Sequence, residues 1–312
     1  MTTGSPAAPL EVKTASSRKP FVLMTLLMGI IIPPLALIAG MILAWNSFFG
    51  PLDMILFFGM YLVSGFGITI GFHRYFSHKS FDAPKPVVFM LGVMGSMAMQ
   101  GPIFWWVSTH RLHHAHSDHE KDPHSPHAPG EHSFLVHFWH SHIGWLFRPA
   151  TSPVNKYVPD LRAQPMLRFI DSTFLLWAIL GVMIPAVLGG LITMSWMGAL
   201  TGLIWGGLVR ILAEHHATWS VNSICHLWGD SPYKSNDESK NNAVVGVLAL
   251  GEGWHNNHHA FPTSARHGLR WWQFDSSWVA ITTMKKLGLV SNVKVPSPER
   301  QEMKLRKEAP AN

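Results

Sequence analysis

The chain has 312 residues, of which 47% are hydrophobic and only 13% are charged, and its formal net charge is +6. Soluble domains average about 25% charged residues, so this composition indicates a membrane protein. The single cysteine, Cys225, excludes a disulfide framework and any Cys-rich zinc or iron–sulfur site. The modest positive charge fits the anionic cytoplasmic face of a bilayer, and we expect no nucleic-acid partner.

Residues 1–20 are polar and are predicted to form a disordered cytosolic tail. The next segment, 21–72, is predicted to form a first transmembrane hairpin. Its two arms, Phe21–Trp45 and Leu52–Phe72, are almost entirely apolar and long enough to cross a hydrocarbon core of roughly 30 Å. The turn between them, Asn46–Pro51, is short, so the arms run antiparallel.

Residues 73–171 are predicted to form the first part of a cytosolic cap. Within it, Pro86–Trp106 is apolar but runs directly into a histidine cluster, and we interpret it as a helix at the membrane interface. The remaining predicted boundaries are a second transmembrane hairpin over 172–213, a second part of the cap over 214–295 and a solvated tail over 296–312.

Charge decides the predicted topology. The turns Asn46–Pro51 and Ser195–Met197 contain no Lys or Arg. The positive-inside rule therefore places these turns away from the cytoplasm, and both termini and the histidine clusters on the cytoplasmic side. If Pro86–Trp106 also crossed the membrane, the first two histidine clusters would lie on opposite faces and could not share metals. The sequence thus predicts an all-α membrane protein with four transmembrane helices in two hairpins beneath a cytosolic helical cap.

Eight histidines fall in three clusters with nearly repeated spacing. They are His73 and His78 in FHRYFSH, His110, His113 and His114 in THRLHH, and His255, His258 and His259 in GEGWHNNHHAFP. Positions i, i+3 and i+4 of a helix share one face, so each H-x-x-H-H pattern can direct three imidazoles to one point. Histidine is the commonest metal ligand, and eight exceed the three or four that one zinc takes. The residues therefore predict two metals in the cap. They leave the metal open among iron, copper, zinc and nickel.

Two metals at the foot of membrane helices favour oxygen chemistry on an apolar chain. The sequence has no H-E-x-x-H motif, which leaves a zincin-type protease without its ligands. The alternatives from another class are a bis-histidine haem protein and a metal transporter. Haem ligands would lie inside the spans, and transport would need polar residues at membrane depth, of which the predicted spans are nearly free.

The histidine motifs resemble those of the integral-membrane fatty acid desaturases. The longer match is to the stearoyl-type Δ9 acyl desaturases, over HRYFSHKSF, THRLHHAHSDHEKDPH, SHIGWLF, ATWSVNSICHLWG and GEGWHNNHHAFPTSARHGLRWWQFD. The resemblance implies a non-haem di-iron enzyme that uses O₂ and two electrons to introduce a cis double bond, at Δ9, into a saturated acyl chain during unsaturated fatty acid biosynthesis. A membrane hydroxylase with the same metal pair is the alternative enzyme.

The resemblance also assigns individual residues. Its metal ligands fall on the eight motif histidines and on His226, and Asn222 matches a residue that reaches a metal through water. The i, i+4 spacing of Asn222 and His226 places both on one helical face. The bend of the family's acyl tunnel carries over to Gln100, Trp106 and Thr218. No catalytic residue beyond the metal ligands is implied.

The sequence departs from the animal enzymes where those hold the coenzyme A headgroup. These positions read Gly101, Ser108, Thr109, Pro149 and Ala150. The acyl carrier therefore stays open among coenzyme A, a membrane glycerolipid and a carrier protein. The segment between Pro123 and Trp139 adds four histidines outside the motifs, His124, His127, His132 and His137. We find no cytochrome b5-like segment, so we expect a separate electron donor such as a ferredoxin or a reductase.

Overall fold

The computed structural model describes residues 20–127, 133–148 and 154–306, with side chains from Gly29 onward. Within these ranges every regular element is a helix, and only isolated β-bridges join extended segments. The all-α prediction is therefore confirmed for the described residues. Residues 1–19 of the predicted tail lie outside them, as do His132, Pro149 and Ala150.

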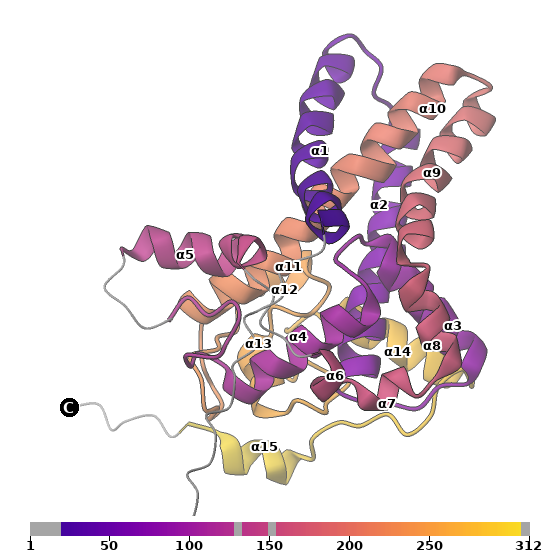
Figure 1. The fold of residues 1–312 in the computed structure, drawn as a ribbon. Coiled ribbons are helices and arrows are strands. Elements are labelled where there is room, and N and C mark those ends of the chain that lie inside the picture. The colour runs from indigo at the N-terminus through magenta and orange to yellow at the C-terminus, as the bar shows by residue number, and fades with distance from the viewer. Residues whose placement is uncertain (1–19, 128–132, 149–153, 307–312) are drawn as a thin grey trace, which may run out of the picture.

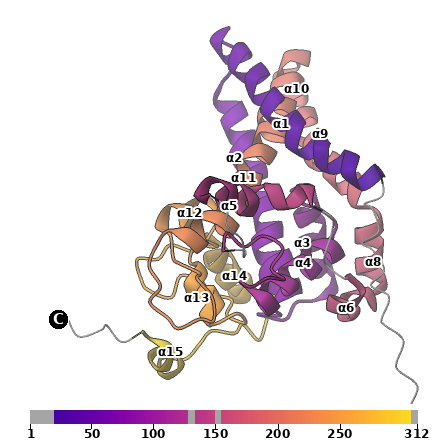
Figure 2. The same ribbon diagram turned by 60° about the vertical axis from the view of Figure 1, so that its left-hand side comes forward.

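Four helices stand together at one end of the molecule, and the remaining helices gather at the other (Figures 1 and 2). The four are α1 (Pro20–Trp45), α2 (Pro51–Phe66), α9 (Phe174–Thr193) and α10 (Trp196–Gly202). Three helical stretches are long and apolar enough to cross a membrane, namely Pro51–Ser77, Phe174–Thr193 and Trp196–Leu227. The described side chains of α1 form a shorter apolar stretch, Gly29–Trp45.

The contact between α9 and α10 depends on small residues. A Cβ on Gly189 would lie 2.2 Å from the carbonyl oxygen of Gly198, so glycine alone allows the two backbones to approach this closely. Helix α9 ends at Met194, whose φ of 47° is left-handed. Helix α10 begins at once, because the hydroxyl of Ser195 accepts a hydrogen bond from the amide of Met197.

Two of the long helices continue beyond the predicted membrane boundaries. Helix α2 passes without a break into the π-helix η1 (Gly67–Ser77), and α10 passes through the π-helix η3 (Leu203–Val209) into α11 (Arg210–Leu227). The prediction ended these segments at Phe72 and Ala213, where the apolar run stops, but the backbone hydrogen bonds continue. Both helices therefore connect the four-helix end with the histidine-rich end.

The segment Pro86–Trp106 is two helices and not the single interfacial helix that we expected. These are α3 (Lys85–Met97) and α4 (Ile103–His116). Met99 and Gly101 between them have φ values of 59° and 106°, a left-handed conformation that ends a helix. Helix α3 packs against η1, α2 and α9, so one of its faces is buried inside the protein.

The other helices are short and surround the histidines. They are α5 (Phe134–His142), η2 (Gly144–Phe147), α6 (Val154–Tyr157), α7 (Pro159–Arg162), α8 (Pro165–Ser172), α12 (Ala243–Leu248), α13 (His255–Ala260), α14 (Ser276–Lys286) and α15 (Pro298–Lys304). The segment predicted as a solvated tail contains α15 and is docked, because the amide of Arg306 donates to the carbonyl of Pro232 at 2.8 Å.

Candidate metal centre

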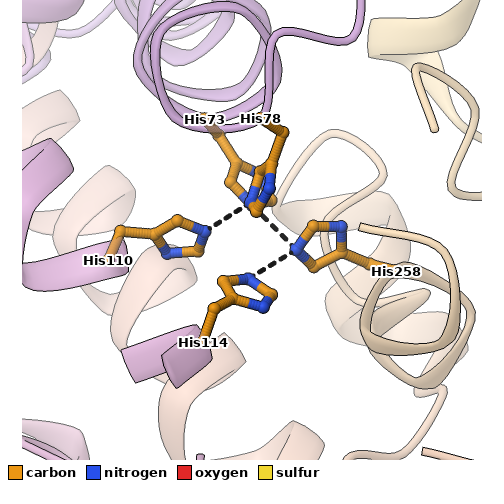
Figure 3. Close-up of side chains that lie close together, drawn as sticks. All are labelled: His73, His78, His110, His114 and His258. Carbon is orange, nitrogen blue, oxygen red and sulfur yellow. Dashed lines mark hydrogen bonds between the residues drawn. The ribbon is translucent and has the colours of Figure 1, made fainter. Parts of the chain in front are cut away.

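The structure brings the nine predicted histidines together in two sets. The first set is His73, His78, His110, His114 and His258 (Figure 3), and the second set is His113, His226, His255 and His259. Each residue of a set offers one ring nitrogen, and these nitrogens all lie within 4.8 Å of one another. Two sets of neutral nitrogen donors match the two metals that the sequence predicts.

The ring nitrogens also meet at distances that suit shared ions. The Nε2 atom of His258 lies 3.1 Å from Nε2 of His73 and 2.9 Å from Nε2 of His114. In the second set, Nε2 of His255 lies 3.0 Å from Nε2 of His226. Imidazole binds zinc at roughly 2.0–2.1 Å, so two nitrogens on one ion lie ~3 Å apart. The donor atoms therefore have the spacing of a coordination shell.

The π-helix η1 explains how His73 and His78 reach the same set. Residues five apart point in different directions on an α-helix, which has 3.6 residues per turn. A π-helix bonds residue i to residue i+5, and the amide of His78 donates to the carbonyl of His73 at 3.2 Å. Both imidazoles therefore project from one side of the helix (Figure 3). Single π-turns inside α-helices often mark functional sites.

Each H-x-x-H-H motif divides its three histidines between the sets. In α4, His110 and His114 belong to the first set and His113 to the second. In α13 the division is reversed, because His255 and His259 belong to the second set and His258 to the first. The i, i+4 pairs share a face, as expected. The middle histidine points to the neighbouring set, so our expectation that all three converge on one point was wrong.

Carboxylates hold the outer nitrogen of four of these histidines. The Nδ1 contacts are His73 with Glu252 at 2.5 Å, His113 with Asp122 at 2.9 Å, His226 with Asp118 at 2.8 Å and His259 with Asp237 at 2.5 Å. Glu252 is itself fixed by the buried guanidinium of Arg74, whose Nη2 lies 3.1 Å from Oε1. A carboxylate on Nδ1 fixes the tautomer and the ring orientation, which leaves Nε2 free to bind a metal.

Burial favours the neutral form of several of these histidines, whereas the neighbouring Asp122 raises the pKa of His113. Burial lowers the pKa of His110, His114, His255 and His258 well below the ordinary value, and the neighbouring histidines lower it further. Burial also lowers the pKa of His259 to about 4, although Asp237 opposes the shift. Burial alone would raise the pKa of Asp237, but its hydrogen bond with His259 lowers that pKa below the usual range. Neutral imidazoles and ionised carboxylates are the forms that metal binding requires.

We expect the change Asp237→Asn to weaken metal binding by about 10–100-fold, the usual effect of losing such an outer partner. An amide cannot supply the negative charge that supports the imidazole of His259. Metal content after dialysis against a graded chelator series measures the effect. Glu238→Gln is the matched control, because Glu238 is the exposed neighbour. Equal metal retention by both variants would show that Asp237 only packs against His259.

An apolar cavity ends against both histidine sets. Its volume is about 620 Å³, including the space at its opening to solvent. The histidines in its wall are His73 and His110 of the first set and His113 and His255 of the second. Asn222 of α11 is also part of this wall. A chain that fills the cavity would pass beside both metal positions.

The three residues assigned to a tunnel bend lie together at this cavity. Trp106 and Thr218 line it. The side-chain amide of Gln100 donates to the hydroxyl of Thr218 at 2.9 Å, and the indole Nε1 of Trp106 lies 3.4 Å from Oε1 of Gln100. The indole of Trp106 also stacks on His110, with 5.3 Å between ring centroids. The structure thus joins the three side chains to each other and to a histidine of the first set.

A second cavity reaches the histidines through different residues and is polar. It measures about 800 Å³ with its open mouth, and it contains His78, His114 and His259. Arg111, Lys234 and Lys304 are also in its wall. The same wall contains Asp237, and Arg111 is paired with Asp160 at 2.8 Å. Histidines of both sets can therefore be approached through a polar opening that carries both signs of charge.

Sequence reasoning missed the carboxylates around the site. Asp118 and Asp122 lie in HSDHEKDPH, directly after the second motif, and Glu252 lies three residues before His255. The rule that metal-binding histidines donate their other N–H to a carboxylate would have found them. Among the extra histidines, His127 donates from Nε2 to the carbonyl of His226 at 2.9 Å and so supports a ligand. His124 lies against His113, with 4.5 Å between ring centroids.

Comparison with known proteins gives consistent matches over most of the chain. The sequence profile described as fatty acid desaturase matches residues 49–284. A hex-5-enoyl-(acyl-carrier protein) acetylenase of Moorena producens (strain JHB) is 38% identical over 88% of this chain and 87% of its own length. A palmitoyl-monogalactosyldiacylglycerol delta-7 desaturase of Arabidopsis thaliana is 42% identical over 78% of this chain and 63% of its own. An sn-1 stearoyl-lipid 9-desaturase of Anabaena variabilis is 40% identical over 75% of this chain and 81% of its own length.

Proposed function

The chain belongs to the fatty acid desaturase family, and on this premise we propose that it is an O₂-dependent desaturase that introduces a cis double bond at Δ9 of a saturated acyl chain. The observation that carries the proposal is the apolar cavity that ends against both histidine sets. The stearoyl-type motifs and the Anabaena relative support position 9. The Arabidopsis relative is named for position 7, so the double-bond position is the quantity to measure.

The proposed reaction assigns a role to each group of residues. The nine histidines would hold two iron ions, and Asn222 would approach one of them through water. The two irons, when bound, would supply O₂ activation and removal of two hydrogens from the chain. The apolar walls of the cavity exclude water from the reacting methylenes. Gln100, Trp106 and Thr218 would hold the chain in a bent conformation, which fixes the methylenes that lie beside the metals.

The proposed partners follow from the two cavities. The apolar cavity would take the acyl chain of an acyl-CoA or of a membrane lipid. Electrons would come from a separate ferredoxin or reductase. Lys234 and Lys304 in the wall of the polar cavity could contact an acidic partner, because complementary charge speeds the encounter.

The proposed topology has four spans in two hairpins, α1 with α2 and α9 with the long helix Trp196–Leu227. We expect reporters fused at Asn46 and Trp196 to face away from the cytoplasm, because both connections lack Lys and Arg. A reporter fused at Asn312 is expected to face the cytoplasm. The measurement is a paired enzymatic reporter that is active on only one side of the membrane. A cytoplasmic signal at Asn46 would leave α1 outside the membrane.

Lipid analysis of cells that express the protein tests the function. We expect a monounsaturated product with a cis double bond at position 9, located by mass spectrometry after derivatisation. The control is the His258→Ala variant at equal expression. A hydroxylated product would assign the chain to the alternative reaction, and a double bond at another position would correct Δ9. Separating the lipid classes before the analysis shows whether the product forms on a glycerolipid or on coenzyme A.

A further inference from the structure

Two ionisable side chains are buried in the long helix Trp196–Leu227. Arg210 has 0% and Glu214 has 3% of its surface exposed, and Nη1 of Arg210 lies 3.0 Å from Oε2 of Glu214. The two residues are four apart on one helix, a spacing that lets side chains meet on one face. Ionisable groups in a membrane span are costly to bury, so each needs an explanation.

Arg210 is explained by the packing of the helices. Its Nη2 donates to the carbonyl oxygen of Gly181 in α9 at 2.8 Å, and its Nη1 donates to that of Met97 in α3 at 3.1 Å. The guanidinium therefore joins α11 to two other helices. Met97 is the last residue of α3, and Gly181 lies four residues before Pro185, which has no N–H to donate to its carbonyl. A buried cation with these acceptors stabilises the fold whether or not a substrate is present.

Glu214 is not explained in the same way. Its Oε2 accepts from Arg210 and from the hydroxyl of Ser64 at 3.0 Å. Its Oε1 is buried and has no hydrogen-bond partner among the described residues. Glu214 is also part of the wall of the apolar cavity. One carboxylate oxygen is thus left unpaired beside the space that the acyl chain would fill.

Glu214 lies toward the end of the cavity away from the histidines. It precedes Asn222 by eight residues on one helix, which is about 12 Å along the helix axis. Gly65, which also lines the cavity and lies beside Glu214, precedes His73 by eight residues on another helix, and Tyr61 of α2 is part of the same wall. A Cβ on Gly65 would lie 3.4 Å from Oε1 of Glu214. The phenol of Tyr61 donates to the carbonyl of Leu248 at 2.6 Å and ties α12 to this end.

We propose that Glu214 is a specificity-determining residue that makes the far end of the acyl cavity polar. This inference rests on the proposed desaturase function. An unsubstituted acyl chain that reaches Glu214 would place its terminal methyl group against a carboxylate oxygen. The methyl group cannot donate a hydrogen bond, so this oxygen would stay unpaired, which is unfavourable. The cavity therefore accepts unsubstituted chains that end before Glu214, and longer chains only if they carry a hydroxyl that donates to Oε1.

Two substitutions separate polarity from charge. Glu214→Leu and Glu214→Gln both remove the negative charge beside Arg210, but only leucine also removes the polar end, since the amide oxygen of glutamine still accepts from the guanidinium. Each variant is expressed beside the wild type and supplied with saturated acids of increasing length. For each chain length, the amount of desaturated product is divided by the amount formed from the next shorter chain. We expect Glu214→Leu to accept the first chain that the wild type excludes, with a ratio at least about tenfold higher, the scale expected when an unpaired polar group is removed from a site. Glu214→Gln is expected to keep the wild-type limit.

A hydroxylated probe and a second position complete the test. The ω-hydroxy form of the first excluded chain is expected to be desaturated by the wild type and not by Glu214→Leu. Gly65→Ala adds a methyl group 3.4 Å from Oε1 and 2.6 Å from Cδ1 of Leu250, so the Leu250 side chain, which also lines the cavity, must shift. The Arg210 pair is left intact, and the limit is expected to move to shorter chains. The same length profile in wild type, Glu214→Leu and Gly65→Ala would overturn the proposal and leave Oε1 to an ordered water. Absence of any desaturated product in the wild type would instead overturn the proposed function.

Discussion

Replacement of His113 by alanine is expected to abolish desaturation and to remove most of the metal from the second histidine set. That set has four histidines, and the change leaves three and also frees Asp122 from its Nδ1 contact at 2.9 Å. Loss of an outer carboxylate alone costs about 10–100-fold in such sites, so loss of a ligand is expected to cost more. His258→Ala leaves four nitrogens in the first set and is expected to keep more metal than His113→Ala, although it is also inactive.

The measurement is iron per chain and product per chain on the same purified sample. The unsubstituted protein is expected to hold about two irons, as a paired metal site requires. His119→Ala is the control, because His119 is exposed and follows the same helix α4. If His113→Ala kept its iron and its activity, the second set would not be a metal site. A fully active sample that contains a single zinc and no iron would rule out the di-iron assignment.

The sequence predicted which histidines lie close together, whereas it did not predict how they divide into two sets. Repeated H-x-x-H-H motifs indicate metal binding from residue type and spacing alone. Which set His258 joins depends on how α13 lies against α4 and η1, and only tertiary packing decides that. The pairing of His73 with His78 depends on a π-helical turn, for which no sequence pattern was available.

The fold was predictable to the extent that it follows from apolar length. The runs around Leu52–Phe72 and Ser172–Met194 correspond to helices that are long and apolar enough to span a membrane. Hydropathy cannot show that a helix continues past its apolar run, so the prediction missed that the span and the helical turn with Asn222 and His226 form one continuous helix. The break between α3 and α4 had a signal in Gly101-Pro102, which the prediction treated as flanking sequence. The place of Glu214 in the cavity wall could not be predicted, because burial is a tertiary property.

The change Trp106→Ala is expected to scatter the double-bond position or to collapse turnover. The indole of Trp106 lines the cavity and contacts two histidines of the first set, with ring centroids 5.3 Å from His110 and 6.2 Å from His73. Its removal creates a cavity of the kind that costs about 3–5 kcal/mol in protein cores. The acyl chain would then have more than one path past the metals, and different methylenes would react. A misplacement of about 1 Å is enough to cost 100-fold in rate.

Trp106→Phe separates shape from hydrogen bonding, because phenylalanine fills most of the space but cannot donate to Gln100. If the ring alone holds the bend, Trp106→Phe keeps the product position and Trp106→Ala does not. If the link from Trp106 through Gln100 to Thr218 also matters, Trp106→Phe and Thr218→Val are expected to scatter the double-bond position alike.

Trp105→Ala is the matched control, because the indole of Trp105 stacks on Trp145 with 5.9 Å between centroids and is not part of the cavity wall. Iron content measured on each variant distinguishes a loose bend from a damaged first histidine set. Unchanged product position at full turnover in Trp106→Ala would mean that this indole only packs against the histidines, and the bend would then have to lie elsewhere along the cavity.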